Sequence, residues 1–312
     1  MRLRLTMVAL NRQGRRNTIL KGERTRRNAG KGQILILTNK LDIAADWVVR
    51  ELEHRRAAFI RLNTEDLPRS RVSWQRDGGC SIETESGRSC DISTVSAAWF
   101  RRPGRPFGER VMQDSAEAVL NAQWRSFLDG ALIERGGIRW INHPISNSRA
   151  ESKMWQLKQA QKCGFAMPRT LVTNSAEVAA AASRQWRDGA ILKALDAPLI
   201  VVNGEERFVF ATRMLPEHLE SAVAFATAPV IVQERLHPKR DIRVTVVGKR
   251  VFTAEASEVT AQDWRLEEPP VQFRPGRLSP ALEARCLELV KQLGLTFGAI
   301  DLIASTAPHI LP

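Results

Sequence analysis

A strand–helix–strand pattern at residues 33–62 constrains the fold of this chain more than any other feature. The run from Gln33 to Thr38 is apolar through its centre and has the length of a strand. In residues 42–56, apolar side chains recur at helical spacing, and Asp42 can cap the helix. A second short strand at 58–62 completes a β-α-β unit. This succession predicts a parallel sheet in a small α/β domain.

Further signals extend this domain to about residue 135, and the pattern then changes. Residues 71–74 and 80–84 resemble a hairpin around Asp77-Gly78-Gly79, followed by a strand at 95–102 and a helix at 113–134. From residue 140 onward, helices alternate with short β-branched or apolar strands. The predicted helices cover 150–163, 174–186, 216–225 and 279–292, and the predicted strands cover 191–193, 199–202, 208–212, 230–234, 242–247, 250–256 and 297–303. We therefore predict an α/β domain at 33–135 and two α+β lobes at 140–312.

The positive charge is concentrated in the first 32 residues. The whole chain has a formal net charge of +13, from 47 Lys and Arg against 34 Asp and Glu. Residues 1–32 hold ten basic side chains and one acid, a charge of +9, which leaves +4 for the remainder. Three interpretations stay open: a disordered tail outside the fold, a basic arm that contacts RNA or an acidic peptide, and an organelle transit peptide. The organised domains themselves do not indicate nucleic-acid binding.

Several classes of protein are excluded by composition. No apolar run approaches the ~18 residues that cross a bilayer, so we expect no membrane span. The four cysteines form neither a CxxC pair nor a cluster with histidine, which argues against a disulfide scaffold and a zinc module. We therefore expect reduced thiols and a cytoplasmic protein.

A small set of polar residues in or beside apolar elements could carry chemistry on ATP. Lys153 begins a helix and Lys193 interrupts an apolar strand, where a buried ammonium group needs an anionic partner. Gln233 and Glu234 end a strand and could read an adenine edge, and Asp301 could bind Mg²⁺. Taken singly, these signals are weak, since a strand lysine can extend to solvent and Asp241-x-Arg243 can be a surface ion pair.

The order of these residues is more specific than any one of them. The set comprises Asn142-x-Pro144, Lys153, Gln156, Ala160, Gly164, Pro168-x-Thr170, Lys193, Gln233-Glu234, Asp241-x-Arg243-Val244 and Gly298-Ala299-Ile300-Asp301. It resembles the ATP-grasp superfamily. Trp99-Phe100-Arg101-Arg102-Pro103, Asp263-Trp264-Arg265 and the β-α-β unit make the chain similar to ATP-grasp ribosomal peptide maturases, the MvdD-like or graspetide ligases, with their pre-ATP-grasp domain. The resemblance covers about residues 33–303.

The resemblance implies activation of Asp or Glu side chains of a precursor peptide, or of an acidic protein, as acyl phosphates. A Lys, Ser or Thr of the peptide then attacks, and an ω-amide or ω-ester macrocycle forms. By position, Lys153 and Lys193 would hold ATP phosphates, Gln233 and Glu234 would line the adenine pocket, and Asp241 would belong to the same nucleotide site. Arg243 would stabilise the transferred phosphoryl group, and Asp301 would ligate Mg²⁺. Arg101, Arg102 and Arg265 would contact phosphate or peptide in a cleft.

The chain departs from this family pattern at its end. The family's next strand carries a Glu-x-Asn pair that completes the magnesium site, and here the sequence stops at residues 307–312. We therefore expect an ATP-grasp fold without its last strands. Two alternatives stay open beside the macrocyclase: a RimK-type ligase that adds glutamate to a protein C-terminus, and an inactive peptide-binding protein. A homodimer is also left open.

Overall fold

The chain forms two compact units. The computed structural model describes residues 2–4, 32–76, 79–104, 115–133, 135–196, 199–202, 205–208, 210–257 and 271–305. One unit spans Ala9–Pro144, and the other combines Met1–Val8 with Ile145–Pro312. The division falls later than the predicted one at 135–140. The reason is that the strand Arg139–Ile141 pairs with the first unit's sheet and Trp140 lies in its core.

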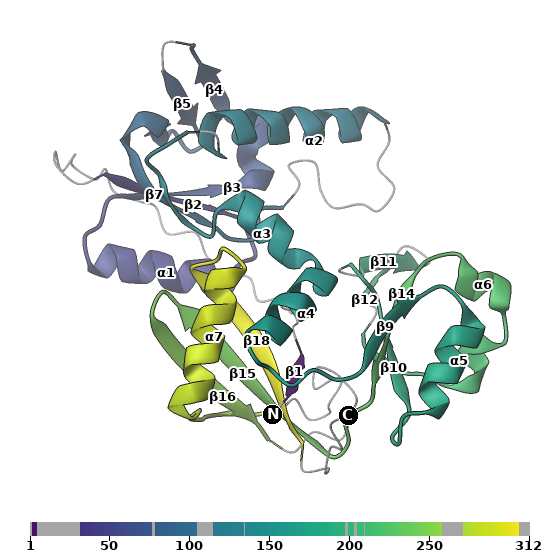
Figure 1. Cartoon of the computed structure of the whole chain (residues 1–312). Helices are drawn as coiled ribbons and strands as arrows, with labels where there is room; N and C mark the ends of the chain where they lie inside the picture. The colour runs from purple at the N-terminus through teal and green to yellow at the C-terminus, as the bar shows by residue number, and fades with distance from the viewer. Residues whose placement is uncertain are drawn as a thin grey trace. The chain divides into compact units, whose positions relative to one another are not determined.

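The first unit contains the predicted β-α-β pattern (Figure 1). Its parallel sheet has the order β3 (Phe59–Asn63), β2 (Gln33–Thr38), β7 (Val95–Phe100) and β8 (Arg139–Ile141). Helix α1 (Ile43–His54) connects β2 to β3. Because β2 has a neighbour on each side and packs in the core, Leu35, Ile36 and Leu37 are almost fully buried. The prediction of a parallel sheet is therefore confirmed.

The predicted elements in the remainder of this unit occur in the expected order, with further short elements between them. Strands β4 (Arg71–Trp74) and β5 (Cys80–Glu83) form the predicted hairpin, and β6 (Ser89–Asp91) adds a third strand that the sequence did not reveal. Short 3₁₀ helices occupy Thr64–Arg69 and Ile92–Thr94. The predicted helix at 113–134 is α2 (Ser115–Leu128) followed by a π-helical turn at Asp129–Ile133. Two residues of the predicted turn, Asp77 and Gly78, lie outside the described residues.

The described part of the second unit contains three antiparallel sheets, the smallest of which is a two-stranded ribbon (Figure 1). The first has the order β13 (Thr212–Arg213), β10 (Ala190–Lys193), β14 (Val230–Glu234) and β9 (Thr170–Thr173). It packs with helix α5 (Ala176–Arg184) around a small core that includes Ala179, Trp186 and Val232. A separate ribbon of β11 (Leu199–Val202) and β12 (Glu205–Phe208) follows β10, and a 3₁₀ helix at Pro216–Leu219 and α6 (Ala222–Ala226) precede β14.

The third sheet of this unit has the order β1 (Arg2–Arg4), β18 (Phe297–Ser305), β15 (Lys239–Val247), β16 (Arg250–Ala256) and β17 (Phe273–Pro275). Helix α7 (Pro280–Gln292) covers one face, where Ile242, Val244 and Val246 of β15 are buried. Since successive strand residues point to opposite faces, the polar residues between them lie on the other face. Strand β17 and the pairing of β1 were not predicted. Apart from residues 2–4 and Gly32, the basic tail lies outside the described residues.

The prediction of one continuous helix at 150–163 is wrong, because two helices meet within this range. Helix α3 spans Pro144–Glu151 and α4 spans Lys153–Lys162. Ser152 between them has an extended backbone, and its hydroxyl accepts a hydrogen bond from the Trp155 amide at 3.4 Å, so it caps α4. Lys153 is consequently the first residue of a helix, as predicted. Among the described residues, no helix is long and apolar enough to cross a membrane.

Candidate active site

The predicted catalytic and metal-binding residues lie opposite each other on neighbouring strands. In the β15–β18 ladder, Arg243 is directly across from Asp301. The Arg243 Nη1 atom lies 2.6 Å from Asp301 Oδ1, and both side chains are largely buried. The structure therefore brings these two predicted site residues into direct contact, on the face of the sheet that does not carry the apolar core.

A second ion pair lies on the same face of β15. The Lys239 ammonium group contacts the Asp241 carboxylate, and only 5% and 8% of the two side chains are exposed. Taking two charges out of water is costly unless they pair closely. Asp241 was predicted to bind the nucleotide, whereas Lys239 was missed. The signal was present in the sequence, because Lys239, Asp241 and Arg243 are each two residues apart on one strand and so share one face.

Lys153 connects α4 to the segment that follows β10. Its Nζ donates to the carbonyl oxygens of Ala194, at 2.5 Å, and Asp196, at 3.1 Å. Burial lowers the pKa of Lys153 from its ordinary value, and attraction to Asp196 partly offsets this effect. The ammonium group is thus held by neutral carbonyls in a partly desolvated position, which is an arrangement that favours an anionic ligand.

Lys193, Gln233 and Thr170 form a polar line across three adjacent strands. Gln233 of β14 pairs with Ile191 of β10 on one side and with Thr170 of β9 on the other. Lys193 Nζ donates to Gln233 Oε1, and Gln233 Nε2 donates to Thr170 Oγ1 at 2.8 Å. The two predicted nucleotide-binding residues are therefore in contact with each other.

Glu234 is engaged by a residue that the sequence did not single out. The Glu234 carboxylate accepts hydrogen bonds from the Arg169 amide at 3.2 Å and from the Arg169 guanidinium at 3.1 Å. The same guanidinium lies over the Trp186 ring, 5.7 Å from its centroid. These contacts join the end of β14 to the start of β9. The Glu234 carboxylate is therefore already bonded to Arg169, and its contact with adenine stays a prediction.

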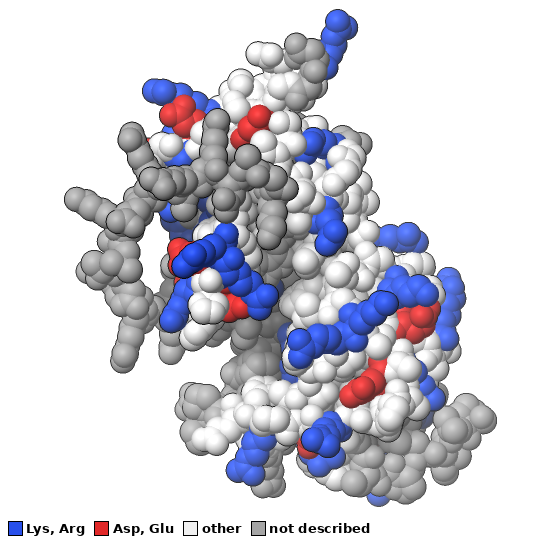
Figure 2. Space-filling view, turned by 90° about the vertical axis from the view of Figure 1, so that its left-hand side faces the viewer, with Lys and Arg blue, Asp and Glu red and all other residues white. Residues whose placement is uncertain are grey.

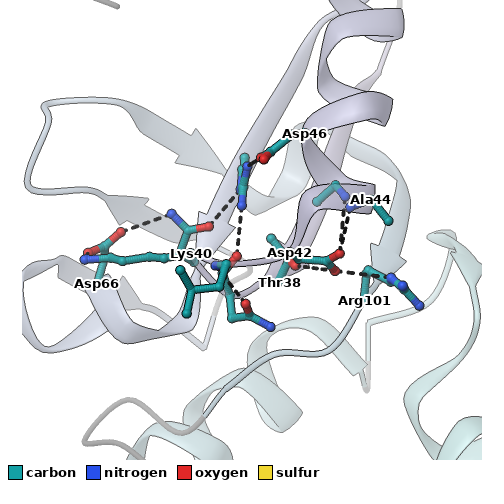
Figure 3. A network of polar contacts seen from close by, with 12 residues as sticks. Thr38, Lys40, Asp42, Ala44, Asp46, Asp66 and Arg101 are labelled. Carbon is teal, nitrogen blue, oxygen red and sulfur yellow. Dashed lines mark hydrogen bonds and ion pairs between the residues drawn. The ribbon is translucent and has the colours of Figure 1, made fainter. Parts of the chain in front are cut away.

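The predicted cleft arginines lie in the first unit or outside the described residues. Arg101 follows β7, and its Nε is 3.2 Å from Asp42 Oδ2. Figure 3 shows that Asp42 also accepts hydrogen bonds from the Thr38 hydroxyl and from the amide of Ala44 at the start of α1. Arg101 is only 16% exposed and Asp42 only 4%. Arg101 therefore lies largely buried beside Asp42, and its predicted contact with phosphate or peptide stays a prediction.

Arg102 differs from Arg101 in its backbone. Its φ of 49° lies in the left-handed region, which is uncommon for a residue with a side chain, and its carbonyl accepts a hydrogen bond from Asn39 Nδ2 at 2.8 Å. This bond joins the segment after β7 to the segment after β2. Arg265, the third predicted contact, lies outside the described residues.

Asp301 is the residue predicted to bind Mg²⁺, and the described residues contain no larger cluster of metal-binding side chains. Within the described ranges, no three His, Cys, Asp or Glu side chains are close enough to hold a metal ion. Asp301 is the single predicted ligand, and its carboxylate is bonded to Arg243. Mg²⁺ usually takes oxygen ligands from one or two carboxylates together with water and substrate phosphates. Asp301 could supply one such oxygen.

The surface does not carry one continuous basic area on the face drawn in Figure 2. Lys and Arg side chains form separate groups there, with acidic and uncharged residues between them. This distribution agrees with the small excess charge outside the N-terminal segment.

The fold of this chain is similar to the folds of several solved structures. No family model and no curated protein matches the chain. The macrocyclase MdnC from Microcystis aeruginosa, solved with its precursor peptide MdnA, matches with a TM-score of 0.77 and 25% identity over 88% of each chain. An ATP-grasp ligase associated with ribosomal peptides in Chryseobacterium gregarium, solved with ADP and leader and core peptides, matches with a TM-score of 0.75 and 27% identity over 88% of this chain and 86% of that one.

These likenesses define the class of protein. The chain has the fold of the ATP-grasp ligases, which are ATP-dependent enzymes. Within that class, it resembles the ligases that act on ribosomal precursor peptides. The macrocyclase MdnB from Microcystis aeruginosa has the same fold, with a TM-score of 0.72 and 22% identity over 88% of both chains. The resemblance inferred from the motifs is therefore confirmed, whereas the roles of the individual site residues stay predictions.

Proposed function

We propose that this chain is an ATP-dependent carboxylate ligase that forms macrocycles in a ribosomal precursor peptide. The observation that carries the proposal is the structural likeness, over 88% of the chain, to MdnC and to the Chryseobacterium gregarium ligase, both solved with peptides. The grouping of Lys193 with Gln233 and of Arg243 with Asp301 supports a nucleotide site in the second unit. The proposed cofactor is ATP with Mg²⁺.

The proposed reaction has two balanced steps. An Asp or Glu carboxylate of the peptide attacks the γ-phosphorus of ATP, which gives an acyl phosphate and ADP. An amine or hydroxyl of the same peptide then attacks the acyl carbon, so an amide or ester forms, inorganic phosphate leaves and the nucleophile loses its proton. Positioning and electrostatic stabilisation would supply most of the catalysis, with Lys153, Lys193 and Arg243 as the cations. Asp301 would give one carboxylate oxygen to Mg²⁺.

The test uses the purified full chain with ATP, Mg²⁺ and a small acidic precursor peptide encoded beside its gene. We expect peptide-dependent release of ADP, and mass spectrometry should show that the peptide loses one water per ring. The Arg243→Ala variant should lose most of this activity. Arg250→Ala is the matched control, because Arg250 is an exposed arginine of the same sheet whose guanidinium lies over Phe252.

Two results would contradict the proposal. Nucleotide binding without any peptide-dependent ADP release would indicate a peptide-binding protein rather than a ligase. Addition of glutamate to a protein C-terminus, with no change in precursor peptides, would indicate a RimK-type activity. A cytoplasmic location and a homodimer stay predictions, to be checked by fractionation and by the mass of the protein in solution.

A further inference from the structure

The polar line across β9, β14 and β10 has a fixed direction of hydrogen bonding. Thr170 Oγ1 donates its single hydrogen to the Pro168 carbonyl at 2.8 Å. A carbonyl oxygen can only accept, so the Thr170 oxygen must accept from its other partner. That partner is Gln233 Nε2, also at 2.8 Å.

The other end of the Gln233 amide is set by Lys193. An ammonium group can only donate, so it requires the amide oxygen of Gln233 rather than the nitrogen. The oxygen and nitrogen of an amide are normally assigned from their hydrogen-bond partners. Here, both partners demand the same orientation, because the threonine side needs a donor and the lysine side needs an acceptor. Gln233 is only 4% exposed, so water has little access with which to replace a lost partner.

We propose that Thr170 is a positioning residue, which orients Lys193 for the nucleotide by holding the Gln233 amide in one orientation. This inference rests on the proposed function, since it takes Lys193 as a ligand of the ATP phosphates. Without the Thr170 hydroxyl, the Gln233 amide has no fixed acceptor for its nitrogen, and rotation would turn that nitrogen toward the Lys193 ammonium group. The lysine would then lose this acceptor, which helps to fix its position.

The test measures the Kd of ATP by calorimetry for the full chain and five variants. Thr170→Val removes the hydroxyl with little change of shape, and we expect it to raise the Kd roughly tenfold, the scale of one lost buried hydrogen bond. Thr170→Ser keeps the hydroxyl and should bind within about twofold of the parent chain, which is below the cost of a lost hydrogen bond. Thr173→Val is the matched control on the same strand, because Thr173 accepts a hydrogen bond from the Ser175 amide and lies outside the line.

Coupling to Lys193 distinguishes positioning from a general structural effect. Lys193→Ala should weaken ATP binding, and adding Thr170→Val to it should weaken binding no further, as expected for two residues that act through one contact. Equal additional weakening in both backgrounds would overturn the inference. If the valine variant does not fold, Thr170→Ala is measured in its place with the same expectations.

The outcomes separate this inference from the proposed function. A parent chain that binds no ATP, or a Lys193→Ala variant that binds it normally, would contradict the nucleotide site itself and the inference with it. A Lys193→Ala variant that binds weakly, together with a Thr170→Val variant that binds normally, would overturn only the role of Thr170.

Discussion

At the scale of single residues, the cations of the candidate site have partners of different kinds. Arg243 contacts the carboxylate of Asp301, whereas Lys153 is held by two neutral carbonyl oxygens. A carboxylate compensates a positive charge much more fully than a carbonyl does. Because burial disfavours the charged form of Lys153, its protonation should affect stability.

We predict that Lys153 makes the chain more stable as the pH rises toward 10.5. Burial lowers the pKa of Lys153 below 10.5 in the folded chain. Between that lowered pKa and 10.5, the unfolded chain binds more protons than the folded chain, so the free energy of unfolding increases with pH. Urea denaturation should show this increase in the parent chain relative to Lys153→Met. A difference between the two chains that does not change with pH would contradict the prediction.

At the scale of elements, the start of α1 depends on one buried carboxylate. Asp42 accepts from the amides of Ala44 and Ala45, so it caps the helix, and it also pairs with Arg101 after β7. One side chain thus joins a helix to the neighbouring strand end (Figure 3). Such a dual role is expected to make its loss more costly than the loss of an ordinary cap.

We predict that Asp42→Ala lowers the free energy of unfolding by about 2–4 kcal/mol, because a helix cap and a buried charge partner are both removed. Asp46→Ala is the matched control from the first turn of the same helix. Asp46 pairs with Arg61 but is 55% exposed, so its loss should cost at most about 1 kcal/mol. Urea denaturation measures both values, and equal losses in the two variants would show that the Asp42 contacts contribute little.

At the scale of the whole molecule, the two units have separate hydrophobic cores. One core contains Leu35, Leu62 and Trp140 of the first unit, and others contain Val244, Leu289 and Val232 of the second. The residues proposed to bind ATP belong to the second unit. A ligand stabilises the part of a protein that must be folded to bind it.

We predict that ATP protects the second unit selectively from hydrogen exchange. Amides of β10, β14, β15 and β18 should exchange more slowly when ATP is bound, since binding at 100 times Kd adds about 2.7 kcal/mol to the stability of the binding-competent state. Amides of β2 and β3 in the first unit should change little. Mass spectrometry of peptic fragments measures both sets of amides. Equal protection in the two units would contradict a nucleotide site formed by the second unit.

Much of the fold followed from local patterns in the sequence. The apolar run 33–38, the spacing within α1 and the alternation along β15 each depend on the period of one element, so they were readable without tertiary structure. The short strands β6 and β17 were not, because three residues carry too little pattern. The break at Ser152 was missed because helical residues continue on both sides of it.

Local patterns in the sequence indicate which residues are candidates for the site, whereas the tertiary fold brings only some of them into contact. Asp241 and Arg243 share a strand, so their common face was predictable from the period of that strand. Arg243 and Asp301 are 58 residues apart in the sequence, and Lys193 and Gln233 are 40 residues apart. Their contacts therefore depend on the register between the strands that carry them. The ligand contact expected of Arg101 stays a prediction, and its ion pair with Asp42 likewise comes from packing that the sequence did not reveal. Register and burial arise from the packing of the whole unit, which no local pattern encodes.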